Sequence, residues 1–280
     1  MAEEGKGSGM VKEKAEPGVK LSWGDEAESE EAEAAAAAAD GNQEAAEPNI
    51  GSLSLREAAG QELYEPEDSQ IQTVTSGDTL YTSAMTFEEL NLSRDLLRGL
   101  YVEMRFKTPS KIQAVSLPMI LTPPYKNLVA QAHNGSGKTT CFVLGMLSRV
   151  DPKLKVPQAL CICPTRELAV QNQEVLLKMG THTGITSVCA IPTDSSNYIP
   201  IAKRPPVTEQ VIIGTPGTIK KWMTAKKLGM REIKILVFDE ADHMLAEDGF
   251  KDDSLRIMKD IERNSAHCQV NSSIKVFSKG

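Results

Sequence analysis

The stretch that constrains the fold most is a loop of small residues, AHNGSGKT, which runs from Ala132 to Thr139. It follows the short apolar stretch 127–131, which we expect to be a strand, and precedes residues 140–147, which we expect to be a helix. A small-residue loop between a strand and a helix, closing on Gly-Lys-Thr, is the layout of a phosphate-binding P-loop. Backbone N–H groups in such a loop converge on an anion, and the helix N-terminus adds partial positive charge. A plain glycine-rich turn is the alternative interpretation.

Within this loop, Lys138 would reach the outer phosphates of a nucleotide, and the Thr139 hydroxyl would help to hold Mg²⁺. The general pattern starts with glycine, whereas this chain has Ala132. The nucleotide-binding residues that we expect here are Ala132, His133, Asn134, Gly135, Ser136, Gly137, Lys138 and Thr139.

Further apolar stretches alternate with helical patterns downstream of the loop. Strands are expected over residues 158–163, 185–191, 210–213 and 233–238, and helices over 166–179 and 218–225. Together with residues 127–131, this makes about five buried strands. Continuous apolar strands that alternate with helices predict an α/β fold, a parallel sheet with helices on both faces. Ligands of such sheets bind at the carboxyl ends of the strands.

The chain upstream of the loop divides by composition. Residues 1–70 hold 18 acidic and 5 basic residues, a charge of −13, whereas residues 71–280 hold 20 acidic and 26 basic residues, a charge of +6. We expect residues 1–85 to form a disordered acidic tail and linker, in which residues 53–65 show partial helical spacing suited to a short helix or a partner-docking segment. The ordered body would begin near residue 86, and its basic charge could attract polyanions.

The first helices of this body have recognisable caps. Ser93 precedes a helical pattern of leucines, and Ser110 follows Pro109, which forces an extended approach. Both serines are expected to be helix N-caps.

Cysteine usage and hydropathy point to a reducing compartment. The five cysteines include no C-x-x-C pair, so neither a disulfide framework nor a zinc site is indicated. The N-terminus lacks the apolar core of a signal peptide, and the chain has no apolar run of 18 residues. We expect a cytosolic or nuclear protein without membrane insertion.

Two acids end the last of the five apolar stretches. Asp239 and Glu240 directly follow Val237-Phe238. An acid at the end of a hydrophobic strand is where P-loop ATPases keep the carboxylate that holds Mg²⁺. Asp239 would hold the metal, and Glu240 could orient or deprotonate the attacking water. The alternative is a pair of acids that merely open a solvated loop.

Taken together, these residues resemble the DEAD-box ATP-dependent RNA helicases over about residues 86–270. The chain carries five of the family's motifs in order, namely Phe106-x-x-Pro109-Ser110-x-Ile112-Gln113, Ala132-x-x-Gly135-Ser136-Gly137-Lys138-Thr139, Pro164-Thr165-Arg166-Glu167-Leu168-Ala169, Thr215-Pro216-Gly217-Thr218 and Asp239-Glu240-Ala241-Asp242. The resemblance implies a RecA-like P-loop NTPase domain over residues 86–270, with the Q motif at 86–114. It also implies ATP and Mg²⁺ as cofactors.

The resemblance assigns roles to individual residues. Asp239, Glu240 and Lys138 would be catalytic, and Thr139 and Asp239 would hold the metal. Gln113 would read adenine, because its amide offers one donor and one acceptor, and Lys107 would contribute to the same nucleotide site. Phe87 could stack on the base, although core packing is an equally good interpretation of that aromatic. Contacts with RNA phosphates would come from Thr165, Arg166, Thr215, Gly217 and Thr218.

Within the family, the chain is most similar to the mRNA-export subgroup that works at the nuclear pore, in its plant form. Thr218, where most relatives have arginine, and Lys220-Lys221-Trp222 carry this similarity, together with residues 134–141. It implies RNA and RNP remodelling in mRNA export by a monomer that binds single-stranded RNA backbone, nuclear-pore factors and export factors.

Two features depart from the family pattern. The double glycine expected between the RNA motifs is replaced by residues 191–197, and residues 271–280 replace the Ser-Ala-Thr strand. We therefore expect residues 271–280 to be a divergent tail of a chain truncated after its first RecA-like lobe. The alternative is that residues 274–278, which alternate in polarity, fill the place of the missing strand. Without a second lobe, weak nucleotide binding and slow turnover would follow, since an arginine finger is worth roughly 10³ to 10⁵ in rate.

These features leave alternatives to an active helicase. One is a non-catalytic nucleotide- and RNA-binding lobe that competes for RNA or for the helicase's partners. A more distant one is another P-loop NTPase, such as one that reads GTP.

Overall fold

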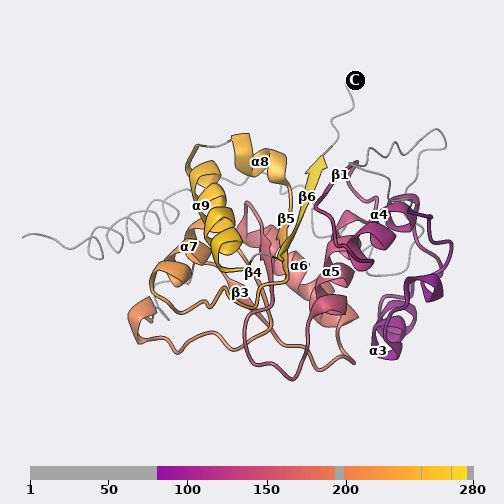
Figure 1. Cartoon of the computed structure of the whole chain (residues 1–280), viewed down its shortest axis with the longest axis horizontal. Coiled ribbons are helices and arrows are strands. Elements are labelled where there is room, and N and C mark those ends of the chain that lie inside the picture. The colour runs from indigo at the N-terminus through magenta and orange to yellow at the C-terminus, as the bar shows by residue number, and fades with distance from the viewer. Residues whose placement is uncertain (1–80, 193–198, 247, 266, 276–280) are drawn as a thin grey trace, which may run out of the picture. The chain divides into compact units, whose positions relative to one another are not determined.

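A six-stranded parallel sheet forms the centre of the fold (Figure 1). The computed structural model describes residues 81–192, 199–246, 248–265 and 267–275, so residues 1–80 of the expected tail and linker lie outside the described residues, as does most of the stretch that replaces the double glycine. The packed body begins before the expected residue 86, because Ala84 is buried and its N–H donates to the Ala114 carbonyl. The strand order is β1-β6-β5-β2-β4-β3, and every neighbouring pair is parallel. The strands are β1 (Leu128–Ala132), β2 (Ala159–Ile162), β3 (Ser187–Ala190), β4 (Val211–Gly214), β5 (Ile235–Phe238) and β6 (Gln269–Lys275).

Helices cover both faces of the sheet, as the alternating apolar pattern predicts. The helical elements are η1 (Glu88–Leu90), α3 (Arg94–Arg98), η2 (Gly99–Glu103), α4 (Lys111–Leu121), α5 (Lys138–Arg149), α6 (Arg166–Met179), η4 (Ile201–Lys203), α7 (Pro216–Thr224), α8 (Ala241–Ala246) and α9 (Asp248–Asn264). No helix in the described ranges is long and apolar enough to cross a lipid bilayer.

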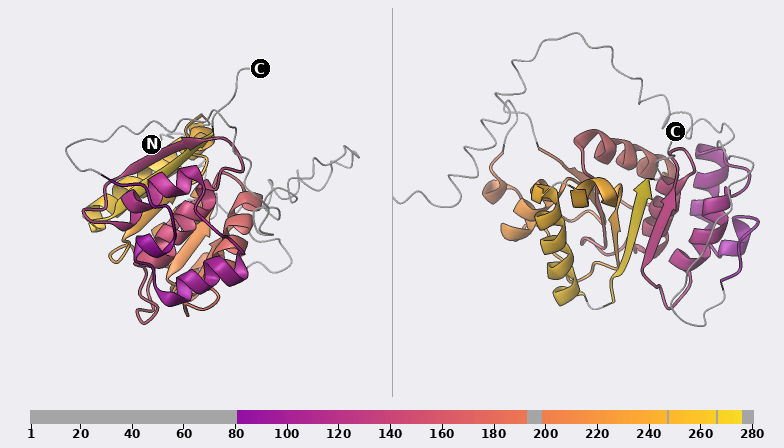
Figure 2. Two further views of the ribbon diagram at one scale, coloured as in Figure 1. Left: turned by 90° about the vertical axis from the view of Figure 1, so that its right-hand side faces the viewer. Right: turned by 90° about the horizontal axis from the view of Figure 1, so that it is seen from above.

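Successive residues of the central strands pack into two separate cores. Cys161 and Val237 face a core with α3, α4, α5 and α6, whereas Leu160 and Leu236 face a second core with α7, α8 and α9. Figure 2 shows the two groups of helices on opposite sides of the sheet. The period of two along each strand explains why these stretches are apolar at every position.

The predicted helix caps are confirmed. The Ser93 hydroxyl accepts a hydrogen bond from the Leu96 N–H, which starts α3. Ser110 forms a capping box with Gln113 at the start of α4, in which each side chain accepts from the other residue's backbone N–H. These caps satisfy helix N–H groups that have no partner within the helix.

The sixth strand differs from the sequence-based expectation. Residues 271–275, expected to belong to a divergent tail, form most of β6, which lies between β1 and β5. Asn271 pairs with Leu128 on one side and Val237 on the other. The backbone ladder accepts this strand although five of its seven side chains are polar, whereas an apolar pattern is the usual signal of a buried strand. The domain boundary expected at residue 270 therefore falls inside a strand.

One polar side chain of β6 is buried without a hydrogen-bond partner in the described structure. Asn271 is 0% exposed, and neither its Oδ1 nor its Nδ2 has a hydrogen-bond partner in the described structure. A buried polar group without a partner typically costs about 1–3 kcal/mol. Asn271 is therefore a weak point in the middle of the sheet.

Candidate active site

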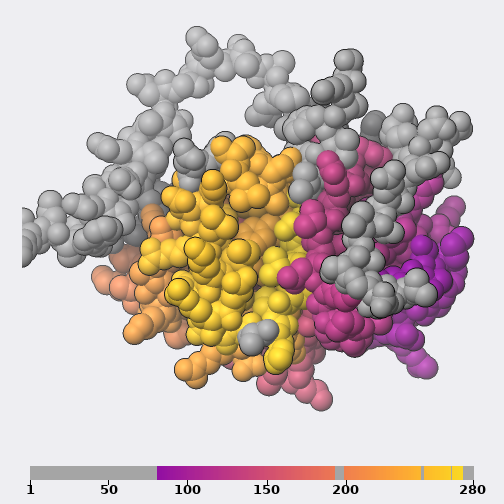
Figure 3. Space-filling view, turned by 45° about the horizontal axis from the view of Figure 1, so that its top comes forward, coloured from indigo at the N-terminus to yellow at the C-terminus, as the bar shows by residue number. Residues whose placement is uncertain are grey.

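Four of the predicted motifs follow the carboxyl ends of parallel strands, so they meet at one edge of the sheet. The loop from Ala132 follows β1, Thr165 follows β2, Thr215 follows β4 and Asp239 follows β5. Only β6 separates β1 from β5, which places their ends about 10 Å apart. Figure 3 is turned toward this edge, where the magenta segment that contains the loop and the orange helix α8 both reach the surface.

The loop after β1 has the backbone of a phosphate cradle. Gly135 and Gly137 have φ of 78° and 94°, in the left-handed region that favours glycine. A Cβ on Gly137 would lie 2.5 Å from the Gln113 Nε2, so a larger residue does not fit there. Lys138 lies along the loop, where its Nζ donates to the carbonyls of Ala132 and His133.

One hydroxyl of this loop is buried without a partner. The backbone carbonyl of Ser136 accepts from the Ser110 Oγ at 2.8 Å, but the Ser136 Oγ has no hydrogen-bond partner in the described structure. A buried hydroxyl without a partner carries a free-energy cost, which an oxygen-rich ligand in the loop would relieve. The remaining predicted positions are accessible, since His133 and Thr139 are half-buried and Asn134 is exposed. The loop therefore fits a bound phosphate group.

Gln113 is hydrogen-bonded to the backbone of the loop. Its side chain is 1% exposed, its Oε1 accepts from the Ser110 N–H at 3.0 Å, and its Nε2 donates to the Gly137 carbonyl at 3.4 Å. Both halves of the amide thus contact the protein, and an adenine would have to replace one of these contacts. Lys107 is exposed on the segment that leads into α4.

Phe87 lies in the hydrophobic core. Its ring is fully buried, with its centroid 6.0 Å from that of Tyr101 in an edge-on contact and 6.5 Å from that of Phe106 in a stacked contact. A ring without exposed surface offers no face to a base. The structure therefore agrees with the core-packing alternative, and the stacking role of Phe87 stays a prediction.

The first acid of the expected metal site is held in place from two sides. Asp239 is 5% exposed, its Oδ2 accepts from the Asn172 Nδ2 at 2.8 Å, and its Oδ1 accepts from the Ser273 Oγ. Each carboxylate oxygen retains a lone pair, so the group fits a role as a ligand of hydrated Mg²⁺. The Ser273 Oγ also accepts from the Glu240 N–H at 2.8 Å, which fixes both acids to β6.

Sequence reasoning missed both partners of Asp239. Asn172 lies inside the correctly predicted helix α6, but its spacing gives no sign that it points toward β5. Ser273 lies in the stretch that was expected to be a tail. The unusual content of serine and asparagine in that stretch was the available signal.

A neutral thiol lies beside this network. The Asn172 Nδ2 is 3.3 Å from the Cys163 Sγ, and burial raises the pKa of the Cys163 thiol well above its ordinary value of 9.0. The thiol therefore stays protonated at neutral pH, and it adds no second negative charge next to Asp239.

The five residues predicted to contact RNA lie at the starts of two helices on the same edge. Thr165 caps α6, and the exposed Arg166 follows it. Thr215 is the N-cap residue of α7, and its hydroxyl lies 3.3 Å from that of Thr218, with Gly217 between them. Helix N-termini carry free N–H groups and partial positive charge, which suits phosphate.

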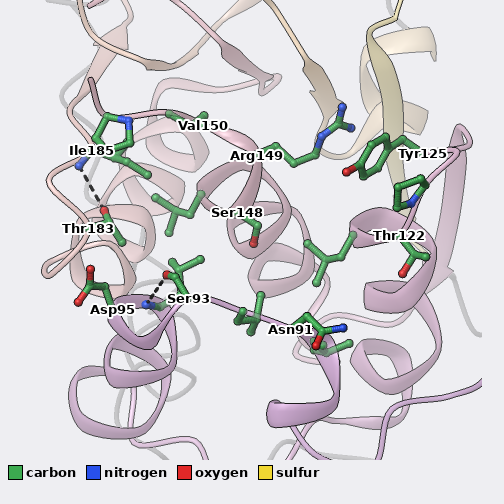
Figure 4. Close-up of a pocket in the computed structure, with 17 residues that line it drawn as sticks. Asn91, Ser93, Asp95, Thr122, Tyr125, Ser148, Arg149, Val150, Thr183 and Ile185 are labelled. Carbon is green, nitrogen blue, oxygen red and sulfur yellow. Dashed lines mark hydrogen bonds between the residues drawn. The ribbon is translucent and has the colours of Figure 1, made fainter. Parts of the chain in front are cut away.

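A separate cavity of about 530 Å³ lies away from these motifs (Figure 4). It is lined by residues of η1, α3 and the ends of α4 and α5, and the guanidinium of Arg149 stacks 3.9 Å above the Tyr125 ring at its wall. α5 starts at the P-loop and runs about 18 Å to Arg149, so the cavity lies toward the opposite edge. None of the predicted site residues lines it.

Comparison with known proteins agrees with these motifs. The model of the DEAD/DEAH box helicase family matches residues 110–278. A protein named DEAD-box ATP-dependent RNA helicase 38, from Arabidopsis thaliana, is 62% identical over 237 residues, which cover 81% of this chain and 48% of the relative.

Solved structures agree as well. The structure titled S. cerevisiae Dbp5 bound to RNA and ADP BeF3 is 40% identical, with a TM-score of 0.63 over 70% of this chain and 47% of that one. A second, titled S. cerevisiae dbp5 l327v bound to nup159, gle1 h337r, ip6 and adp, is 40% identical, with a TM-score of 0.60 over 67% of this chain and 48% of that one.

These relatives share a RecA-like parallel sheet with this chain, which spans about half of their length. The matches are to named helicases, so they do not favour the alternative of a non-catalytic module. The chain belongs to the DEAD/DEAH box helicase family.

Proposed function

We propose that this chain forms the part of an ATP-dependent RNA helicase that binds ATP and RNA backbone, and that couples ATP binding and hydrolysis to remodelling of RNA and RNP in mRNA export. The observation that supports this most is the fixed carboxylate of Asp239. It lies one strand away from a P-loop and is hydrogen-bonded to Asn172 and Ser273.

The nucleotide site would use residues of both strand ends. Main-chain N–H groups of the loop would bind the phosphates, and Lys138 would move from the Ala132 and His133 carbonyls to the outer phosphates. Thr139 and Asp239 would hold Mg²⁺, which neutralises charge on the phosphate oxygens when it is bound. Glu240 would orient the attacking water or accept its proton.

The RNA site would use the N-termini of α6 and α7. Thr165, Arg166, Thr215, Gly217 and Thr218 offer hydroxyls, a guanidinium and free helix N–H groups at one edge. Such contacts hold the backbone without reading the sequence, and their affinity falls with salt.

The titles of two solved structures indicate the biological setting. A relative of known structure is titled as bound to nup159 and gle1, and another as bound to RNA. Partners of the same kind, at the nuclear pore and in the cytoplasm and nucleus, are therefore proposed for this chain.

Two variants at the edge of the sheet test the catalytic assignment. The Glu240→Gln change should retain ATP binding but lower turnover at least 10²-fold, because the water loses its base. The Lys138→Ala change should weaken binding of a fluorescent ATP analogue, whereas Arg263→Ala at the far end of α9 should change neither quantity. Turnover that is insensitive to both Glu240 and Lys138 would refute the proposal. Measuring the same turnover in a form extended by a second lobe would separate a slow enzyme from a non-catalytic module.

A further inference from the structure

An ion pair lies directly beside the RNA-binding turn proposed at the start of α7. The Lys220 Nζ is 2.6 Å from the Asp253 Oδ1, and it joins α7 to α9, which pack against each other (Figure 1). The two side chains are 37% and 21% exposed. The pair is therefore accessible to solvent on one side but fixed between two helices.

Asp253 also lies close to the turn itself. A Cβ built on Gly217 would be 3.9 Å from the other carboxylate oxygen, the Asp253 Oδ2. A negative charge thus lies beside a residue proposed to contact an RNA phosphate. The Asp253 carboxylate would repel a phosphate bound at the turn, and its partly buried setting strengthens this repulsion compared with water.

The turn has no cation of its own to offset this carboxylate. Thr215-Pro216-Gly217-Thr218 contains no charged side chain, and Lys220 is the first cationic residue of α7. The Lys220 ammonium is held on the Asp253 carboxylate rather than extended into solvent.

We propose that Lys220 is a positioning residue for RNA binding: it neutralises Asp253 and fixes α7 to α9, so that the turn at Thr215–Thr218 can accept a phosphate of single-stranded RNA. This inference rests on the proposed RNA function of that turn. Lys220 acts through Asp253 and does not contact the phosphate itself.

Two simpler roles for Lys220, a surface ion pair and a direct phosphate contact, predict different results. An ordinary surface ion pair contributes little to stability and leaves RNA affinity unchanged. A lysine that contacts phosphate directly lowers the salt dependence by about one unit when it is removed, and its loss is not cured by removing an acid. A positioning lysine is needed only while Asp253 keeps its charge.

The experiment measures binding of a fluorescein-labelled oligouridylate to the 280-residue chain by anisotropy at several salt concentrations. Lys220→Ala should weaken binding about tenfold, because it leaves the Asp253 charge uncompensated. Asp253→Asn should bind as tightly as the wild type or more tightly, and the double variant Lys220→Ala/Asp253→Asn should return to within about threefold of the wild type. Lys220→Arg should preserve binding. The matched control is Arg263→Ala, which breaks the Arg263–Asp260 ion pair on α9, the helix that carries Asp253.

The outcomes are distinguishable. If the wild type binds RNA but Lys220→Ala matches it, or if the double variant stays as weak as Lys220→Ala, the inference is wrong and the proposed function stands. If the wild type and all variants fail to bind at low salt, the proposed RNA function of this turn is wrong, and the inference falls with it. Equal melting temperatures for the single and double variants would exclude unfolding as the cause of a weak signal.

Discussion

Replacing Asn271 by leucine should raise the free energy of unfolding, because the substitution removes a buried amide that has no partner. Asn271 lies between Leu128 and Val237 in the middle of the sheet, and both polar atoms of its side chain lack a hydrogen bond in the described structure. Removing an unpaired amide recovers about 1–3 kcal/mol. The apolar side chain adds about 1.5–3 kcal/mol of burial, from which about 1–3 kcal/mol of overpacking is subtracted.

The expected net gain is about 2 kcal/mol, which corresponds to a rise in Tm of about 4–8 °C for a domain of this size. Urea denaturation with an unchanged m-value would show that the gain is one of stability and not of altered compactness. Thermal unfolding followed by circular dichroism supplies the second measurement.

The matched control is the same substitution at Asn172. That side chain is also buried, but its Nδ2 donates to Asp239 and lies against Cys163. Leucine there removes a partner of a buried carboxylate, so the free energy of unfolding should fall by about 2–3 kcal/mol. The two substitutions have the same chemistry and opposite expected signs. A loss of stability in Asn271→Leu, as large as that in Asn172→Leu, would refute the reasoning.

Three further predictions concern the loop and one thiol. Gly137→Ala should reduce both ATP affinity and stability, since its Cβ would meet Gln113. Gly135→Ala should cost only about 1 kcal/mol of backbone strain, because no atom lies within 4 Å of its Cβ. Calorimetry would compare the stabilities of the two variants, and binding of an ATP analogue would compare their affinities. Gln113→Ala should lower the preference for ATP over GTP and weaken the loop, and unchanged selectivity in a competition assay would argue against adenine recognition by this amide. Burial raises the pKa of Cys268 to about 11 from 9.0, so the folded state retains a proton that the unfolded state loses. The stability that this retained proton contributes is complete below pH 9 and decreases by about 2 kcal/mol as the pH rises to 11. Cys268→Ser should therefore flatten the fall in urea midpoint between pH 9 and 11, and a fall parallel to that of the wild type would contradict the assignment.

Much of the fold could be predicted from local sequence signals. The serine caps and the full extent of α6 follow from side chains within four residues of the helix start, together with helical periodicity. Five strands were indicated by apolar runs, because a strand covered on both faces must be apolar at every position. Their ends shifted by one or two residues, since hydrogen bonding to neighbouring strands decides where a strand stops.

Tertiary context decided the rest. β6 could not be recognised from polarity, because the ladder on both sides and not its side chains holds it in place. Phe87 could not be assigned from its type, since a base and a hydrophobic core attract the same ring. The edge that gathers the motifs was predictable from parallel topology, whereas the bonds of Asp239 to Asn172 and Ser273 join residues 67 and 34 positions apart, which no local pattern reveals.

From the position of β6 between β1 and β5, we expect the described sheet to be completed late during synthesis. Among the described strands, the one that separates β1 from β5 is the last to be synthesised, and it pairs with a partner made about 140 residues earlier. Until it docks, β1 has no neighbour among the described strands, and the acids at the end of β5 lack the hydroxyl of Ser273. A nascent chain would therefore carry every nucleotide motif in its sequence and still be unable to assemble them, so the competence to bind ATP would arise only as the final strand closes the sheet.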